Sequence, residues 1–205
     1  MRVRILHPIY FITDRNIAGL SNIQIVRQAI SAGIRLIQLR EKQMTKKELY
    51  REALSLRELT RKYKTTFIIN DHMDIALAVD ADGVHLGQED MPLEEARRIM
   101  GKKKIIGIST HSLKQALKAE RAGADYIGFG PVFSTATKDA GRSKGIKALA
   151  EIRWHVRIPI AAIGGITPEN ISQVMSAGAD TAAVISGILA GDIRLNVKRC
   201  LMPLL

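Results

Sequence analysis

Short apolar runs alternate with segments of helical spacing along almost all of this 205-residue chain. The runs predict strands at residues 9–13, 34–38, 67–69, 83–86, 105–108, 126–129, 158–163 and 181–185. Helices are predicted at residues 22–32, from 45 to about 59, at 73–79, from Pro92 in a first turn, at 112–122, 146–157 and 167–177, and from Ser186 onward. Strands that alternate with helices predict a parallel sheet, and eight such units close a barrel.

A weak internal repeat supports this count. Ala32-Gly33, Ala122-Gly123-Ala124-Asp125 and Ala177-Gly178-Ala179-Asp180 each lie between a predicted helix and a predicted strand, and Asp80-Ala81-Asp82-Gly83 is a variant. An open doubly wound sheet is the alternative, but no Gly-x-Gly-x-x-Gly pattern follows the first strand. The sequence therefore predicts an α/β protein with one domain over residues 1–205, a (β/α)8 TIM barrel.

Composition narrows the class of protein. The chain has no apolar run of about 18 residues, so no transmembrane helix is expected, and its start lacks a signal-peptide pattern. Its single cysteine, Cys200, excludes an internal disulfide framework, which favours a cytoplasmic location. The net charge of +11 would suit nucleic acid or anionic substrates. An aromatic content of 4% leaves few stacking platforms, so no nucleic-acid partner is expected.

Polar side chains follow nearly every predicted strand, whereas the segments before the strands are plain. After the second strand, Gln38, Arg40 and Lys42 alternate, so an extended backbone would aim all three at one place. Two cations and an amide on one face suit a multivalent anion, although a solvated strand end would have the same pattern. Because the carboxyl ends of barrel strands meet on one face, these side chains predict an active site there.

Two carboxylates and a histidine belong to the same face. Asp71 and Asp90 are candidate ligands for Mg²⁺, which takes one or two carboxylates and completes its shell with phosphate oxygens and water. Each of them is equally well placed to cap the helix that follows. His85 ends the fourth strand and is interpreted as a substrate contact, with a histidine at the edge of the core as the alternative.

A second anion site is predicted at the last two strands. Gly164-Gly165 would let a phosphate approach the backbone ahead of a helix, and Ile185-Ser186-Gly187 offers further amides after the eighth strand. A plain turn is the alternative for the glycine pair. The long loop 130–145 adds Thr135, Thr137 and Lys138, and it is predicted to close over substrate and bring Lys138 into the site.

Eight stretches along the chain resemble the thiamine-phosphate synthase family, in the superfamily that it shares with thiazole tautomerase. They are Tyr10–Asp14, Gln38–Lys42, Ile69–Asp71, Gly83–Asp90, Gly107–His111, Gly128–Phe133, Thr135–Lys138 and Ile163–Ile166. The resemblance implies a transferase that joins an aminopyrimidine methyl diphosphate to a thiazole phosphate, with Mg²⁺ as cofactor. Its products would be thiamine monophosphate and diphosphate. The implied partners are these two small molecules; the oligomeric state, including a homodimer, stays open.

The resemblance also implies residue roles. Gln38 and Asn70 would contact the pyrimidine. The diphosphate would be held by Arg40, Lys42, Ser109 and Lys138, and Mg²⁺ by Asp71 and Asp90. The thiazole phosphate would be bound by Thr135, Thr137, Gly165, Ile185 and Ser186. Ser134 departs from the family, which usually has proline there, and the loop 139–144 is unusually polar.

Three other functions are alternatives to the synthase. A thiazole tautomerase would keep the barrel but commonly loses diphosphate ligands, and it often has a catalytic histidine where this chain has Pro131. A barrel isomerase or lyase for another sugar phosphate is more distant, and a basic nucleic-acid-binding protein belongs to another class. The diphosphate ligands of this chain favour the synthase.

Overall fold

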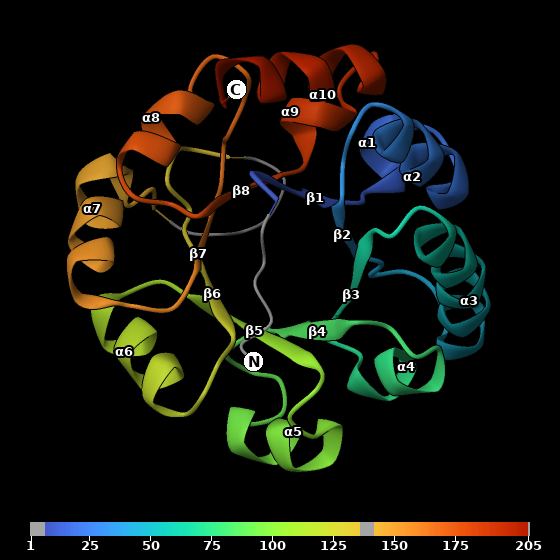
Figure 1. Cartoon of the computed structure of the whole chain (residues 1–205), viewed down its shortest axis with the longest axis horizontal. Coiled ribbons are helices and arrows are strands. Elements are labelled where there is room, and N and C mark those ends of the chain that lie inside the picture. Colours follow the sequence, from blue (N-terminus) through green and yellow to red (C-terminus); the bar gives the residue numbers. More distant parts are fainter. Residues whose placement is uncertain (1–6, 136–141, 205) are drawn as a thin grey trace.

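The computed structural model describes residues 7–135 and 142–204 of the chain. In this part of the chain eight parallel strands pair in sequence order, and β8 pairs with β1, which closes the barrel. Figure 1 looks along the barrel, with the strands in a central ring and the helices around them. The predicted (β/α)8 TIM barrel is therefore confirmed. In the described residues, no helix is long and apolar enough to span a membrane.

The strands lie close to the predicted runs. They are β1 Ile9–Ile12, β2 Leu36–Leu39, β3 Thr66–Asn70, β4 Gly83–Leu86, β5 Ile105–Thr110, β6 Tyr126–Phe129, β7 Ile160–Ile163 and β8 Thr181–Val184. The seventh strand begins two residues later than predicted, after Pro159, whose ring leaves no N–H for a sheet hydrogen bond.

The described residues form an outer layer of helices. It comprises α1 Arg15–Ala18, α2 Asn22–Ser31, α3 Lys46–Lys62, α4 Met73–Ala78, α5 Leu93–Met100, α6 Leu113–Arg121, α7 Gly145–His155, α8 Ile171–Ser176, α9 Ser186–Leu189, α10 Ile193–Leu201 and the 3-10 helix η1 Met202–Leu204. The predicted capping box at Thr45 is confirmed, since its side chain accepts from the Glu48 N–H and Glu48 bonds back. Ser112 caps α6 as predicted.

Two helix starts were predicted wrongly, and one helix was missed. Pro92 is the N-cap residue of α5 rather than part of its first turn. The eighth helix begins at Ile171, because Asn170 accepts from the Thr167 N–H and donates to the Gly165 carbonyl, which holds residues 165–170 in turns. The helix α1 has four residues, too few to show a helical period.

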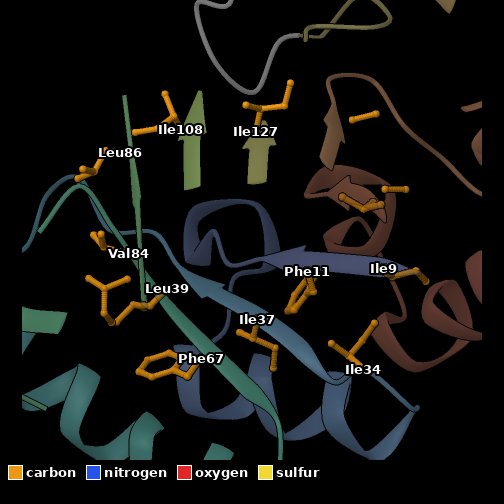
Figure 2. Close-up of a cluster of buried hydrophobic side chains, with 14 of the residues drawn as sticks. Ile9, Phe11, Ile34, Ile37, Leu39, Phe67, Val84, Leu86, Ile108 and Ile127 are labelled. Atoms are coloured by element: carbon orange, nitrogen blue, oxygen red, sulfur yellow. The ribbon is translucent and has the colours of Figure 1, made fainter. Parts of the chain in front are cut away.

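Alternation along the strands divides the core in two. Outward residues pack against the helices, among them Ile9, Ile37, Phe67 and Ile127. Figure 2 shows Ile37 and Phe67 between the strands and the helices below them. Inward residues form a separate cluster inside the barrel: Tyr10, Ile12, Leu36, Ile68, Ile105, Tyr126, Ala161 and Ala183. Because side chains alternate, the last inward position of each strand faces the carboxyl end of the barrel.

The aspartates of the repeat fasten the amino-terminal side of the barrel. Asp125 Oδ2 accepts from the Ile106 N–H at 2.8 Å and from Arg97 at 2.5 Å. Asp82 likewise accepts hydrogen bonds from the Phe67 N–H in β3 and from Arg57 in α3. Asp180 accepts from the Ile160 N–H in β7 and from Arg153 in α7. The repeat is thus more than a helix stop, since its carboxylate ties a helix to two adjacent strands.

Candidate active site

A pocket opens at the carboxyl ends of the strands, where the sequence predicted it. Its wall includes these predicted site residues: Gln38, Arg40, Asn70, His85, Ser109, Thr135, Gly165, Ile185 and Ser186. Lys42, Asp71 and Asp90 are not among the residues of this wall, although Asp71 contacts both Lys42 and Asp90. Thr137 and Lys138 lie outside the described residues, as does the middle of the loop predicted to close.

Arg40 and Gln38 extend from the end of β2 with different partners. Arg40 Nη1 lies 3.3 Å from Asp14 Oδ2, and its backbone N–H donates to Thr13 Oγ1 at 3.1 Å. Gln38 is buried, and its Nε2 donates to the Tyr10 hydroxyl at 2.6 Å. Both residues line the pocket, as their shared strand face predicted. Asp14 holds Arg40 in place and offsets its charge.

Lys42 lies beside two carboxylates. Its Nζ is 2.5 Å from Asp71 Oδ2, and Asp71 in turn is within hydrogen-bond reach of Asp90. Burial raises the pKa of Asp71, but the hydrogen bond and the charge of Lys42 outweigh burial and hold that pKa below its usual range. Burial and the negative charge of Asp71 raise the pKa of Asp90. The two acids form a like-charge pair that a cation stabilises.

Neither carboxylate caps a helix, although both were candidates for that role. Asp71 has a left-handed backbone (φ 62°), and the N-cap of α4 is His72, without a side-chain cap bond. Asp90 Oδ2 accepts from the Gly87 N–H at 2.6 Å inside its own loop, and the N-cap of α5 is Pro92. The cap interpretation is therefore wrong for both residues.

The paired acids fit a magnesium ion better than a structural metal centre. Among the described residues no group of three or more His, Cys, Asp or Glu side chains could hold a metal. Magnesium usually takes one or two carboxylates and shares its other positions between water and substrate phosphates. Asp71 and Asp90, with Lys42 as their present counter-charge, provide such a donor set.

His85 and Ser109 join a hydrogen-bond network that the sequence did not predict. His85 Nδ1 is 2.8 Å from the Tyr126 hydroxyl, and its Nε2 is 2.9 Å from Ser109 Oγ. The Tyr126 hydroxyl is 2.9 Å from that of Tyr10. In the sequence both tyrosines lie within apolar runs that predict buried strands. Their one visible signal is a hydroxyl at an inward position of a buried strand, which requires a polar partner.

The opposite side of the pocket is formed by the loops after β6, β7 and β8. Gly164 and Gly165 have positive φ angles of 104° and 63°, and an added Cβ would lie 2.5 Å from Pro131 and from the Ser134 carbonyl oxygen. The glycine pair is therefore required by close packing of these loops. Next to it, Ser186 begins the short helix α9, where the first N–H groups have no partner within the helix.

The barrel and its pocket indicate a class of protein. A (β/α)8 barrel with a pocket at the carboxyl ends of its strands, and with paired acids and cations at the same ends, has the architecture of an enzyme for small anionic substrates. Residues 9–188 match the model of the thiamine monophosphate synthase family. The chain belongs to this family.

Relatives of known name agree over nearly their whole length. Thiamine-phosphate synthase from Chloroflexus aurantiacus is 49% identical over 186 residues, which is 90% of this chain and 86% of the relative. The synthase from Clostridium acetobutylicum is 46% identical over 91% of this chain and 89% of its own. A solved thiamine phosphate pyrophosphorylase from Pyrococcus furiosus superposes with a TM-score of 0.89 at 43% identity, covering 95% of this chain and 94% of that one. The function of the chain is that of a thiamine-phosphate synthase, a transferase of thiamine biosynthesis.

Proposed function

We propose that the pocket joins an aminopyrimidine methyl diphosphate to a thiazole phosphate, giving thiamine monophosphate and diphosphate. The observation that carries this proposal is the charge arrangement at adjacent strand ends. Arg40 lines the pocket, Lys42 contacts Asp71, and Asp71 contacts Asp90. A diphosphate needs clustered cations, and a diphosphate leaving group that carries Mg²⁺ needs carboxylates beside them.

The two substrates take different sides of the pocket. Gln38 and Asn70 contact the pyrimidine, and Arg40, Lys42, Ser109 and Lys138 bind its diphosphate. The thiazole phosphate lies against Thr135, Thr137, Gly165, Ile185 and Ser186. Support for the second side comes from the short extra helix α9 after β8, because barrels often bind phosphate with the loops after the last two strands and the start of such a helix.

Asp71 and Asp90 would hold Mg²⁺ in this enzyme. The bound ion would neutralise charge on the departing diphosphate. Lys42, which pairs with Asp71 in the structure, would then contact the diphosphate as well.

The chain's own residues position the reactants. The C–O bond to the diphosphate breaks, and its electron pair leaves with the diphosphate, while Arg40, Lys42 and Ser109 stabilise the charge on the oxygens. The remaining pyrimidine methyl cation is stabilised by its amino group, and the thiazole nitrogen uses its lone pair to form the new C–N bond. The protein has to hold this nitrogen in line and exclude water. No covalent nucleophile is needed.

The decisive experiment measures diphosphate release and thiamine monophosphate together, with both substrates and Mg²⁺. We expect equal amounts of the two products in the wild type and a loss of both in Arg40→Ala. Arg61→Ala is the matched control, because Arg61 also pairs with an aspartate, Asp80, but 61% of its side chain is exposed, away from the pocket. If Arg40→Ala is as active as Arg61→Ala, the diphosphate site is misplaced.

Thiazole tautomerase is the weaker alternative, because this chain has Pro131 where a tautomerase often has its catalytic histidine. This residue lines the pocket, and its side chain has no group that could move a proton. A tautomerase would also release no diphosphate, so the same assay separates the two functions. A sugar-phosphate isomerase or lyase would turn over neither substrate, and a nucleic-acid binder would show steep salt-dependent binding to DNA or RNA. The cytoplasmic location stays a prediction.

A further inference from the structure

A continuous row of hydrogen bonds crosses the floor of the pocket. Gln38 Nε2 is 2.6 Å from the Tyr10 hydroxyl, and that hydroxyl is 2.9 Å from the hydroxyl of Tyr126. Tyr126 continues to His85 Nδ1 at 2.8 Å, and His85 Nε2 ends the row at Ser109 Oγ at 2.9 Å. The row, which we call the floor chain, therefore connects strand β2 with strand β5 through the inside of the barrel.

The barrel makes room for this row at two glycines. A Cβ added to Gly107 would lie 2.0 Å from Tyr126 Cζ, and one added to Gly128 would lie 3.0 Å from His85 Cε1. Tyr10 and Tyr126 are 1% and 0% exposed, so water cannot replace a missing partner. Burial raises the pKa of both phenols, which keeps them protonated as donors. Each hydroxyl thus has one proton to give and must accept from its other neighbour.

With a neutral His85 ring, only two arrangements satisfy every member of the floor chain. In the forward arrangement the Gln38 amide N–H donates to Tyr10, Tyr10 to Tyr126, and Tyr126 to His85 Nδ1. His85 Nε2–H then donates to Ser109, whose own proton is left for the pocket. In the reverse arrangement every donor becomes an acceptor, and the amide of Gln38 turns over. A mixed arrangement leaves a buried hydroxyl proton without an acceptor, which the low-dielectric interior disfavours.

A bound anion selects the forward arrangement. An anion on Ser109 accepts hydrogen bonds and never donates them, so the Ser109 proton must point at it. The chain then fixes the other end: Gln38 donates its N–H to Tyr10 and has its amide oxygen to offer to the pocket. That oxygen is an acceptor, which suits the amino group of a pyrimidine.

We propose that Tyr10, Tyr126 and His85 are positioning residues that couple the two ends of the pyrimidine substrate. Diphosphate on Ser109 orients the Gln38 amide to accept from the ring's amino group, through four hydrogen bonds in the core. This inference rests on the proposed function, which puts the diphosphate at Ser109 and the pyrimidine at Gln38. His85 thereby acts through its neighbours.

The tautomer of His85 tests the direction of the floor chain without any turnover. Nitrogen NMR of ¹⁵N-histidine-labelled protein distinguishes the Nε2–H from the Nδ1–H form, and His85→Gln assigns the His85 signals among the 5 histidines. With saturating inorganic diphosphate and Mg²⁺ we expect the Nε2–H form. The Nδ1–H form, or an imidazolium with both protons, under these conditions would overturn the proposal.

Two amide variants test the role of each ring nitrogen. A glutamine places its amide nitrogen near His85 Nε2 and can donate to Ser109, whereas an asparagine reaches the Tyr126 side only. We expect His85→Gln to bind inorganic diphosphate within about twofold of the wild type. His85→Asn and Tyr126→Phe should each bind it about fivefold to tenfold more weakly, the effect of one hydrogen bond. Equal losses in the two amide variants would reduce His85 to a space-filling role.

The steady-state constants of Tyr126→Phe provide a further test, because KM and kcat should respond differently. Since Ser186 and its neighbours form the other side of the pocket, Tyr126→Phe should leave the KM for the thiazole phosphate unchanged and lower kcat for coupling. A parallel change in both constants would indicate general damage to the barrel. If the wild type forms no thiamine monophosphate yet shows the Nε2–H form with diphosphate, the proposed function fails alone. If it forms product and shows the Nδ1–H form, the coupling fails alone.

Discussion

Replacing Lys42 by alanine separates a catalytic charge from an ordinary surface charge, because Lys46 provides a matched control. Lys42, in the loop after β2, bonds to Asp71, in the loop after β3, and Lys46, the first residue of α3, bonds to Asp74 in α4. Their side chains are 53% and 67% exposed. Lys42→Ala and Lys46→Ala therefore remove the same charge from neighbouring places, and only the first change touches the proposed site.

The expected losses of stability and activity follow from the environments of Lys42 and Lys46. Exposed ion pairs contribute about 0.2–1 kcal/mol to the free energy of unfolding, so both variants should stay folded. A hydrogen bond from a cation to a phosphate that carries developing charge is worth about 1.5–3 kcal/mol. Converted into rate, Lys42→Ala should lose about 10- to 150-fold in kcat/KM for the pyrimidine diphosphate. Lys46→Ala should stay within about twofold, because Lys46 reaches no proposed substrate atom.

The assay is continuous detection of released diphosphate at saturating Mg²⁺ and thiazole phosphate, with urea unfolding as the check on stability. Wild-type turnover in Lys42→Ala would remove the diphosphate from this loop. An equal loss in both variants would attribute the effect to net charge, and a repeat at higher salt would then reduce both losses.

Three further outcomes follow from the described contacts. EDTA should abolish activity and Mg²⁺ restore it, and Asp90→Asn should raise the Mg²⁺ concentration needed for half-maximal activity; full activity in EDTA would contradict this. Because burial and a neighbouring carboxylate raise the pKa of Asp90, the Mg²⁺ concentration that the wild type needs should also rise as the pH falls. Asp125→Ala should lower the free energy of unfolding by about 2–4 kcal/mol in urea titrations, since it leaves a strand N–H and an arginine unpaired; a change below about 0.5 kcal/mol would refute the fastening role. Cys200 is fully buried, and burial raises its pKa to about 12, so a thiol reagent at neutral pH should modify it only at the rate of unfolding; rapid modification of the native enzyme would count against this packing.

The sequence predicted the barrel because its local signals are strong. Each strand begins and ends within a few residues of an apolar run, and the Thr45 capping box marks the start of α3. The sequence-based prediction was wrong where a residue outside the local pattern determines how the backbone folds. Thr167-Pro168 resembles a helix start, yet Asn170 bonds across these residues and keeps them in turns.

The candidate site was predicted as a set of residues but without its connections. The predicted strand ends placed Gln38, Arg40 and His85 on one face, and the pocket brings these three together. The floor chain could not be read from the sequence, because Tyr10 and Tyr126 meet only when the barrel closes. The glycines that make room for it are equally ambiguous in a strand, where a bulge or a bend is the common explanation.

The pairing of Lys42 with Asp71 also predicts an order in the binding of ligands. The sequence suggested that two cations on one face repel each other unless an anion is present, but in the structure each cation has a carboxylate partner, Asp14 for Arg40 and Asp71 for Lys42. Diphosphate alone would draw Lys42 from Asp71 and leave Asp71 and Asp90 as an unbalanced acidic pair. Diphosphate that arrives with Mg²⁺ gives the acids a new cation and Lys42 a new anion. Inorganic diphosphate should therefore bind at least about tenfold more tightly with Mg²⁺ than without it, measured by calorimetry. In Asp71→Asn, where Lys42 has no charged partner to leave, this difference should shrink, and an undiminished difference would show that the exchange does not occur.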